Sequence, residues 1–260
     1  MRKIKKRLIL SFVLNLIMII LFISSIIIEI IKIHKDPYTI YQNVWGLFRY
    51  FTFDGNLLTF IFNSIICFKQ YQALKLSNDE KIKEKIITHF LYIISLISVC
   101  NDIIIFVVVV IIFLPFGGEE WRKGLVGTYN TSTVHIVIPL LLTFRFLFLD
   151  KRKRELKLYE KFFGGGPMLI YGTIIYILCG TKTFTSFDDF DGDGKIPYPF
   201  FDVYHQKWYL CFLVALSIFI FGFGMSFLFD FLNKKFEKLI WPYNSTIVRI
   251  GQEIERDEEN

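Results

Sequence analysis

Six long apolar runs, with basic residues clustered at alternate ends of them, dominate this sequence. A helix needs about 20 mostly apolar residues to cross the hydrocarbon core of a bilayer. The sequence therefore predicts an all-α fold, a polytopic bundle of six transmembrane helices. The predicted spans are 8–33, 54–74, 87–115, 133–150, 164–181 and 208–232.

The composition supports a membrane protein rather than a soluble one. Hydrophobic residues make up 53% of the chain, above the roughly 45–50% of soluble domains, and the mean hydropathy is +0.47. The net charge of +6 is also a property of nucleic-acid-binding proteins, but the charges here stand just outside the apolar runs. We therefore expect no nucleic-acid partner.

The loops differ in their content of Lys and Arg, which predicts the orientation. Basic clusters such as the run Lys151–Arg154 fall in every second loop, and the other loops carry few basic residues. Because cytoplasmic loops carry the excess of Lys and Arg, we expect both termini on the cytoplasmic side of the plasma membrane. The predicted inside segments are 1–7, 75–86, 151–163 and 233–260, and the outside segments are 34–53, 116–132 and 182–207.

The chain divides into a transmembrane domain, residues 1–240, and a cytoplasmic tail, residues 241–260. The basic N-terminus precedes an apolar run longer than the core of a signal peptide, so we interpret the run as a retained first span. Four cysteines lie in or beside apolar runs without close pairing, which indicates buried hydrophobic residues rather than disulfides or a zinc site.

Ionisable groups inside the spans are costly in lipid and therefore draw attention as functional candidates. Asp102, next to Asn101, falls near the middle of the third span, and Arg145 falls in the fourth. If the two lie at the same depth they can form an ion pair, either structural or catalytic. In the last span, Gly222 and Ser226 form a small-residue pair that permits close helix contact with a partner the sequence does not identify.

Thr52 and His135 precede or open two parallel spans and are expected at similar depth near the outer leaflet. A hydroxyl and an imidazole at one depth are the minimum for nucleophilic acyl transfer, in which the imidazole accepts the hydroxyl proton and later returns it to the leaving group. The simpler interpretations are a helix N-cap for Thr52 and an interface residue for His135.

Three segments carry a family resemblance. Residues 48–58 read F-R-Y-F-T-F-D-G-N-L-L, residues 134–141 read V-H-I-V-I-P-L-L, and residues 198–203 read Y-P-F-F-D-V. In this order and spacing they resemble motifs of bacterial six-span membrane proteins related to the androgen-induced-protein (FAR/AIG-like) family. Animal members of that family are threonine hydrolases that cleave fatty acid esters of hydroxy fatty acids.

The resemblance implies that Thr52 and His135 are the catalytic residues and that membrane lipids or acyl esters are the substrate, with no required cofactor. Related sequences place an acidic residue shortly after the His motif, where this chain has Arg145. Asp202, before the sixth span, is the first candidate to replace that acid, and Asp54 is the second. Asn56 is a candidate to stabilise the oxyanion.

Residues 189–196 match the first eight positions of a calcium-binding loop. Asp189, Asp191 and Asp193 alternate before a Gly that permits a tight bend, but Phe200 stands where a bidentate Glu is expected. The segment is either a flexible acidic turn or a weak structural calcium site on the outer side.

Three classes of function are compatible with these features. The first is an intramembrane Thr/His hydrolase of fatty acyl esters, which requires the two side chains within hydrogen-bond reach or one water apart. The second is a small-molecule transporter or its substrate-binding membrane subunit, which predicts a polar cavity near Asn101 and Asp102. The third is a polytopic protein with a purely structural role.

Overall fold

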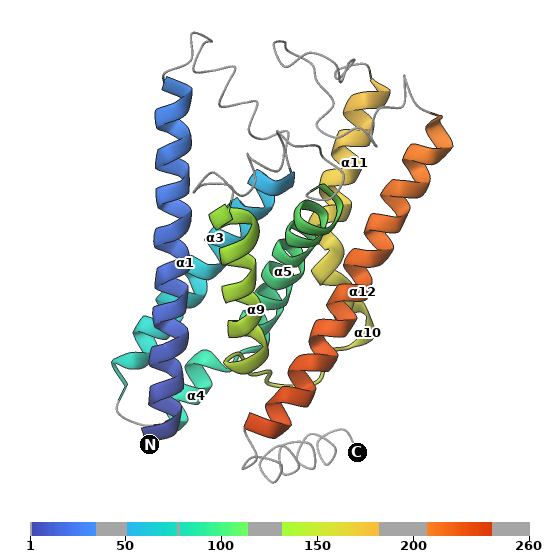
Figure 1. Cartoon of the computed structure of the whole chain (residues 1–260). Helices are drawn as coiled ribbons and strands as arrows, with labels where there is room; N and C mark the ends of the chain where they lie inside the picture. Colours follow the sequence, from blue (N-terminus) through green and yellow to red (C-terminus); the bar gives the residue numbers. More distant parts are fainter. Residues whose placement is uncertain (1, 35–50, 77–78, 114–131, 182–206, 241–260) are drawn as a thin grey trace.

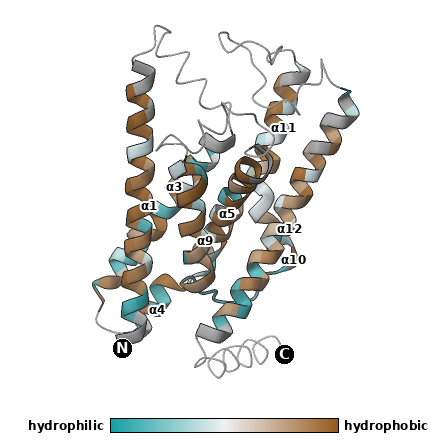
Figure 2. Cartoon of the chain, viewed as in Figure 1, coloured by the Kyte–Doolittle hydropathy of each residue, from teal (hydrophilic) through white to brown (hydrophobic). Residues whose placement is uncertain are grey.

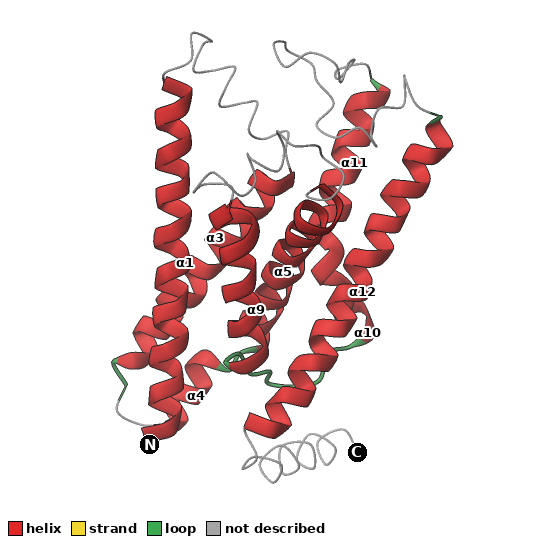
Figure 3. Ribbon diagram, in the orientation of Figure 1, coloured by secondary structure: helices red, strands yellow, loops and turns green. Residues whose placement is uncertain are grey.

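The structure, a computed structural model, describes residues 2–34, 51–76, 79–113, 132–181 and 207–240. Within these ranges every regular element is a helix, and Figure 3 shows only helices and the loops that join them. The predicted all-α class is confirmed.

Six of the described helical segments run up and down a bundle (Figure 1), and they overlap the six predicted runs. They are α1 (Arg2–His34), α3 (Phe51–Leu74), α5 (His89–Phe106) continued by η1 (Val107–Phe113), η2 (Thr133–Val137) continued by α9 (Ile138–Phe148), α11 (Gly166–Gly180) preceded by α10 (Leu158–Lys161) and η3 (Phe162–Gly165), and α12 (Trp208–Ile240). A short helix, α4 (Asp79–Ile86), lies between α3 and α5.

Four segments among the described residues are long and apolar enough to cross a membrane: Lys5–Ile28, His89–Val110, Leu158–Leu178 and Ala215–Glu237. The predicted fifth span begins about two turns earlier than expected, because α10 and η3 extend α11 toward the N-terminus. The segment Thr133–Phe148 is apolar but shorter than these four, and α3, which carries several polar residues, is not among them. The described part of the chain therefore contains four candidate spans by length and composition, and a total of six remains a prediction.

One end of the bundle is rich in charge. The start of α1, helix α4, the loop after α9 and the last turns of α12 gather there in Figure 1, and Figure 2 shows hydrophilic residues around α4 and the end of α12. Ion pairs connect these segments, with Glu237 of α12 lying 3.8 Å from Lys151 and 3.4 Å from Arg152. This clustering puts the start of α1 and the end of α12 on the same side of the bundle.

Helix α5 lies at the centre and packs against α3, α9, α12 and η3. Its Tyr92, Leu96, Val99 and Cys100 are buried in the main core together with Phe146 of α9. The ring of Phe146 stands 5.4 Å from that of Tyr92 and 6.0 Å edge-on from that of Phe229 in α12. A cluster of three aromatic rings therefore joins α5, α9 and α12. Cys67 and Cys100 are buried and free, as predicted.

Small residues allow η3 to approach α5 and α12 closely. A Cβ added at Gly164 would lie 2.6 Å from Ser226 Cβ and 2.9 Å from Cys100 Sγ, and one at Gly165 would lie 2.5 Å from the Phe223 ring. Gly222, one turn before Ser226, faces Gly165, with 3.9 Å between its added Cβ and Gly165 Cα. The small-residue pair of the last span therefore has an internal partner, the glycines of η3.

Glu160 fixes the start of α10 against α5. One carboxylate oxygen accepts the Lys157 backbone N–H at 2.7 Å, and the other lies 2.6 Å from Arg154 and 2.7 Å from His89 Nε2. Because a carboxylate in the first turn satisfies backbone donors that lack helical partners, Glu160 acts as a cap and a tether at once. The tether holds the charged end of the bundle together.

Candidate functional site

The predicted Thr/His site lies at the end of the bundle opposite the charged one. Position 52 falls in the first turn of α3, but the side chain of Thr52 lies outside the described residues. His135 lies in η2, the π-helical turn that leads into α9, and both α3 and η2 begin in the upper half of Figure 1, below the upper ends of α1 and α12. The prediction that Thr52 and His135 meet therefore stays a prediction.

The imidazole of His135 is half-buried, and one of its two ring nitrogens is among several buried polar atoms that lack a partner within the described part of the chain. Its Nδ1 atom is buried and has no hydrogen-bond partner among the described residues. A buried polar atom without a partner costs about 1–3 kcal/mol, so native structures contain few of them and they often mark functional positions. His135 is the member of the predicted pair whose side chain the structure describes, and its role as a catalytic base stays a prediction.

Polar residues of α3 form a buried stripe along one face. Asn56, Thr59, Asn63 and Gln70 are all 5% exposed or less. Their spacing of three, four and seven residues repeats with the helical turn, and position 52 precedes Asn56 by four residues and falls on the same face. Thr59 and Asn63 were not predicted as site residues, although this spacing was available in the sequence.

A small cavity opens beside this stripe. Its volume is about 10 Å³, and it lies between α1, α3 and the first turn of α9. Asn56, Thr59 and Asn63 line one side, and Ile138, three residues after His135, lines another. The cavity is large enough for little more than a water molecule, which requires polar partners of the kind that Asn56 and Thr59 provide.

Asp102 is fully buried in α5 and accepts two hydrogen bonds at one carboxylate oxygen. Thr59 Oγ1 donates at 2.7 Å and Asn101 Nδ2 at 3.3 Å. Its other oxygen, Oδ2, is buried without a partner among the described residues, as is Asn101 Oδ1. The anticipated ion pair with Arg145 does not form within the part of the chain that the structure describes.

Arg145 instead pairs with Asp150, at 3.3 Å, and is fully buried. Its guanidinium also donates to Asn63 Oδ1 at 2.6 Å, to Asn15 of α1 and to Ser95 of α5. The anticipated partner was wrong because Asp150 follows at the end of the same helix, where the guanidinium reaches it. Arg145 thereby bonds to side chains from α1, α3 and α5.

The network continues along α1 toward the charged end. Asn15 donates to Gln70 at 2.8 Å, and Gln70 donates to Ser11 at 2.7 Å. An Arg surrounded by this many acceptors has its donors largely satisfied, which suits a structural role in lipid. Asn15, Ser95 and Gln70 were missed in the sequence because single Asn, Ser and Gln residues within apolar runs carry no motif.

The remaining predicted site residues fall into two groups. Asp54 is half-buried in the first turn of α3, and Asn56 follows it on the buried stripe. The predicted calcium ligands and Asp202 lie outside the described residues, so the calcium site stays a prediction; the ligands are Asp189, Asp191 and Asp193. Among the described residues no cluster of His, Cys, Asp and Glu is arranged to hold a metal.

No protein-family model matches the chain, and neither the curated proteins nor the solved structures include one that is significantly similar to it. The resemblance to the FAR/AIG-like family therefore rests on its three short motifs.

Proposed function

We propose that this chain is a multi-pass protein of the plasma membrane with six spans and both ends in the cytoplasm, and that it hydrolyses fatty acyl esters within the bilayer. The basic residues at the shared end of α1 and α12 support this orientation, because positive loops stay in the cytoplasm. In this orientation the Thr52–His135 end faces outward. We retain the androgen-induced-protein resemblance as the origin of the two assigned roles.

The observation that carries the enzymatic proposal is the imidazole of His135, half-buried with Nδ1 buried and unpaired among the described residues. A buried imidazole nitrogen without a hydrogen-bond partner can act as a general base, because it can accept the proton of a nucleophile's hydroxyl group. Position 52 lies on the same face of α3 as Asn56 and Thr59, which line the cavity beside the start of α9.

The proposed reaction runs through an acyl-enzyme. The Thr52 hydroxyl attacks the ester carbonyl while His135 takes its proton, and Asn56 donates to the oxyanion. His135 returns the proton to the leaving alkoxide, which departs as the alcohol. Water then attacks the acyl-enzyme by the same proton transfers and releases the fatty acid. Asp202 or Asp54 would orient the imidazole in place of the acid that related sequences carry.

The test compares the purified chain with its Thr52→Ala and His135→Gln variants, using a fluorophosphonate probe and p-nitrophenyl acyl esters of increasing length. We expect labelling and turnover to fall by about a hundredfold or more in both variants. Thr173→Ala is the matched control, because the Thr173 hydroxyl is exposed and only donates to Leu169 O of its own helix. Unchanged turnover in Thr52→Ala would remove the enzymatic proposal.

A second candidate is a small-molecule transporter or the substrate-binding subunit of one. Asp102 Oδ2 and Asn101 Oδ1, which lack partners among the described residues, favour it, because buried acceptors in a membrane bundle mark ion and substrate pathways. Neither of the two cavities described here is lined by these residues. If liposome-reconstituted protein moves a solute and Asp102→Asn abolishes that movement while ester turnover is absent, this candidate replaces the enzyme.

A further inference from the structure

A second cavity lies at the charged end of the bundle, away from His135. Its volume is about 50 Å³, and it lies between the first turns of α1, the end of α3, helix α4, the start of α5 and the loop after α9. Three of its lining residues are cations contributed by three separate elements: Arg7 by α1, Lys83 by α4 and Lys151 by the loop. Nothing in the hydrolase proposal uses this cavity.

The three cations lie close enough to influence one another. Burial lowers the pKa of Lys151, Glu237 opposes that shift, and the positive charges of Lys83 and Arg7 lower the pKa further. Like charges gathered in a half-buried pocket repel each other, and the fold keeps them together at a cost. An anion in the pocket would remove that cost.

The acidic groups nearby are already engaged. Asp150 lines the pocket but is held by Arg145 at 3.3 Å and by the Ser95 hydroxyl. Glu237 lies 3.8 Å from Lys151 and is shared with Arg152 at 3.4 Å. Among the described residues that line the pocket, cations therefore outnumber carboxylates.

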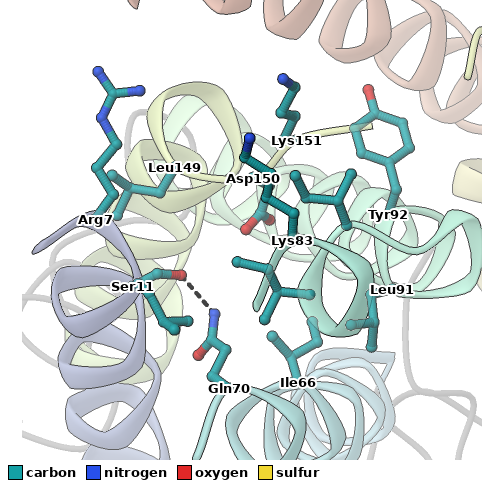
Figure 4. Close-up of a pocket in the computed structure, with 13 residues that line it drawn as sticks. Arg7, Ser11, Ile66, Gln70, Lys83, Leu91, Tyr92, Leu149, Asp150 and Lys151 are labelled. Carbon is teal, nitrogen blue, oxygen red and sulfur yellow. Dashed lines mark hydrogen bonds between the residues drawn. The ribbon is translucent and has the colours of Figure 1, made fainter. Parts of the chain in front are cut away.

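The other side of the pocket suits an apolar chain. Leu8, Ile66 and Leu91 line it, and Ser11 and Gln70 add hydrogen-bonding groups between the apolar and the charged parts. Figure 4 shows the nitrogen-bearing ends of Arg7, Lys83 and Lys151 on one side of the pocket, with Ile66, Gln70 and Leu91 on the opposite side. A basic pocket between helices at a membrane surface is the arrangement that recognises phosphate-bearing headgroups.

We propose that this pocket binds a phosphate group, with Arg7, Lys83 and Lys151 as its charged ligands. The phosphate comes either from an anionic membrane lipid, whose acyl chain then lies along the apolar wall, or from a soluble phosphorylated compound. In both cases the recognising chemistry is the same, since three cations from three elements line the side of the pocket that faces the anion.

The experiment uses the full chain in phosphatidylcholine nanodiscs and counts bound molecules by native mass spectrometry. One arm adds phosphatidylglycerol, a second adds inorganic phosphate, and a third adds more phosphatidylcholine. We expect phosphatidylglycerol or phosphate to bind with defined stoichiometry and phosphatidylcholine not to. Binding of phosphatidylglycerol that excess inorganic phosphate does not displace assigns the lipid source, whereas binding of phosphate itself assigns the soluble one.

The variant Arg7→Gln/Lys83→Gln/Lys151→Gln should weaken binding on the order of a hundredfold. Its matched control removes the same charge from exposed residues outside the pocket, Lys6→Gln/Lys153→Gln/Lys235→Gln, and should bind as the unchanged protein does. If the triple variant does not fold, Lys83→Gln alone, on the short helix α4, should weaken binding about fivefold. Equal losses in variant and control, or no preference for either anion over phosphatidylcholine, would overturn the proposal.

Discussion

The helices in the two halves of this bundle are held together by different interactions. The helices α1, α3, α5 and α9 are joined by buried hydrogen bonds centred on Arg145, whereas η3 and α12 are joined by close packing of Gly164, Gly165 and Gly222 against their neighbours. In lipid the hydrophobic effect does not drive helices together, because the surrounding tails are as apolar as Leu. Association depends on polar bonds or on close van der Waals contact, and this chain uses both.

The difference teaches where each half is vulnerable. The polar half depends on a few side chains whose loss leaves other buried groups unpaired. The small-residue half depends on absent atoms, so it is disturbed by adding volume rather than by removing a bond. The following substitutions test this division, and their expected effects decrease in order.

Arg145→Met should have the largest effect. It leaves Asp150, Asn15 and Asn63 without their charged donor, and loss of one partner of a buried pair costs about 3–5 kcal/mol. We expect little folded protein in detergent. If the variant folds, its Tm should fall by about ten degrees, the shift that such a loss of stability gives in a chain of this length. Lys153→Met, an exposed residue, is the control. A variant as stable as the unchanged protein would mean that the polar half does not depend on Arg145.

Gly164→Ala should come next, at about 1–3 kcal/mol, because the new methyl group meets Ser226 and Cys100. Gly166→Ala is a matched control two residues away, since its Cβ would have no atom within 4 Å. Adding Ser226→Gly to Gly164→Ala should recover part of the loss. Thermal unfolding in detergent measures all three, and equal effects at Gly164 and Gly166 would contradict the packing argument.

Thr59→Val should have a smaller effect in the polar half. It removes the 2.7 Å hydrogen bond to Asp102, and interhelical bonds of this kind contribute about 0.6 kcal/mol on average in membrane proteins. Thr173→Val removes a hydroxyl that donates only to its own helix and should be nearly neutral. If the two variants lose the same stability, burial of the Thr59–Asp102 bond contributes nothing.

Removal of the exposed ion pair between Lys234 and Glu155 should have the smallest effect, against which the effects of the buried substitutions can be compared. The hydrogen bond from Lys234 lowers the pKa of Glu155 below its ordinary value of 4.5. A carboxyl whose pKa is lower in the folded state stabilises the protein above its unfolded pKa and loses that contribution as the pH falls through the folded value. Lys234→Met should therefore change Tm slightly at pH 7, and the change should shrink as the pH falls below 4.5 and through the lowered folded pKa. A change that grows toward low pH would contradict this sign.

Much of the helical architecture could be predicted from the sequence, because an apolar run long enough to span a bilayer specifies a helix without reference to its neighbours. The predicted runs 8–33 and 208–232 lie within α1 and α12, which extend beyond them at the charged end of the bundle. The fifth span begins at Leu158, before the predicted start at 164, which the sequence places later because Leu158–Phe163 mixes apolar and charged residues. Only the structure shows that α10 and η3 continue into α11.

The candidate sites were harder to predict. The polar stripe of α3 follows from helical spacing, but the partner of Arg145 does not, since Asp102 and Asp150 were both available and only the path of the guanidinium decides between them. The cationic pocket is harder still. Arg7, Lys83 and Lys151 fall in three separate predicted inside segments, and nothing in their spacing indicates that they line one cavity.

The sequence by itself indicated the lipid environment, the helical class and the alternation of charge between loops, because these depend on composition within single segments. The tertiary structure decided which buried polar groups meet, which glycines face which helix and which cations share a pocket. The physical reason is that the hydropathy of a span depends on residues that are neighbours in one segment. Hydrogen bonds and ion pairs instead require side chains that are distant in the sequence to lie within a few ångströms of each other. Ser95 is 50 positions from Arg145, and Asn15 is 130 positions from it.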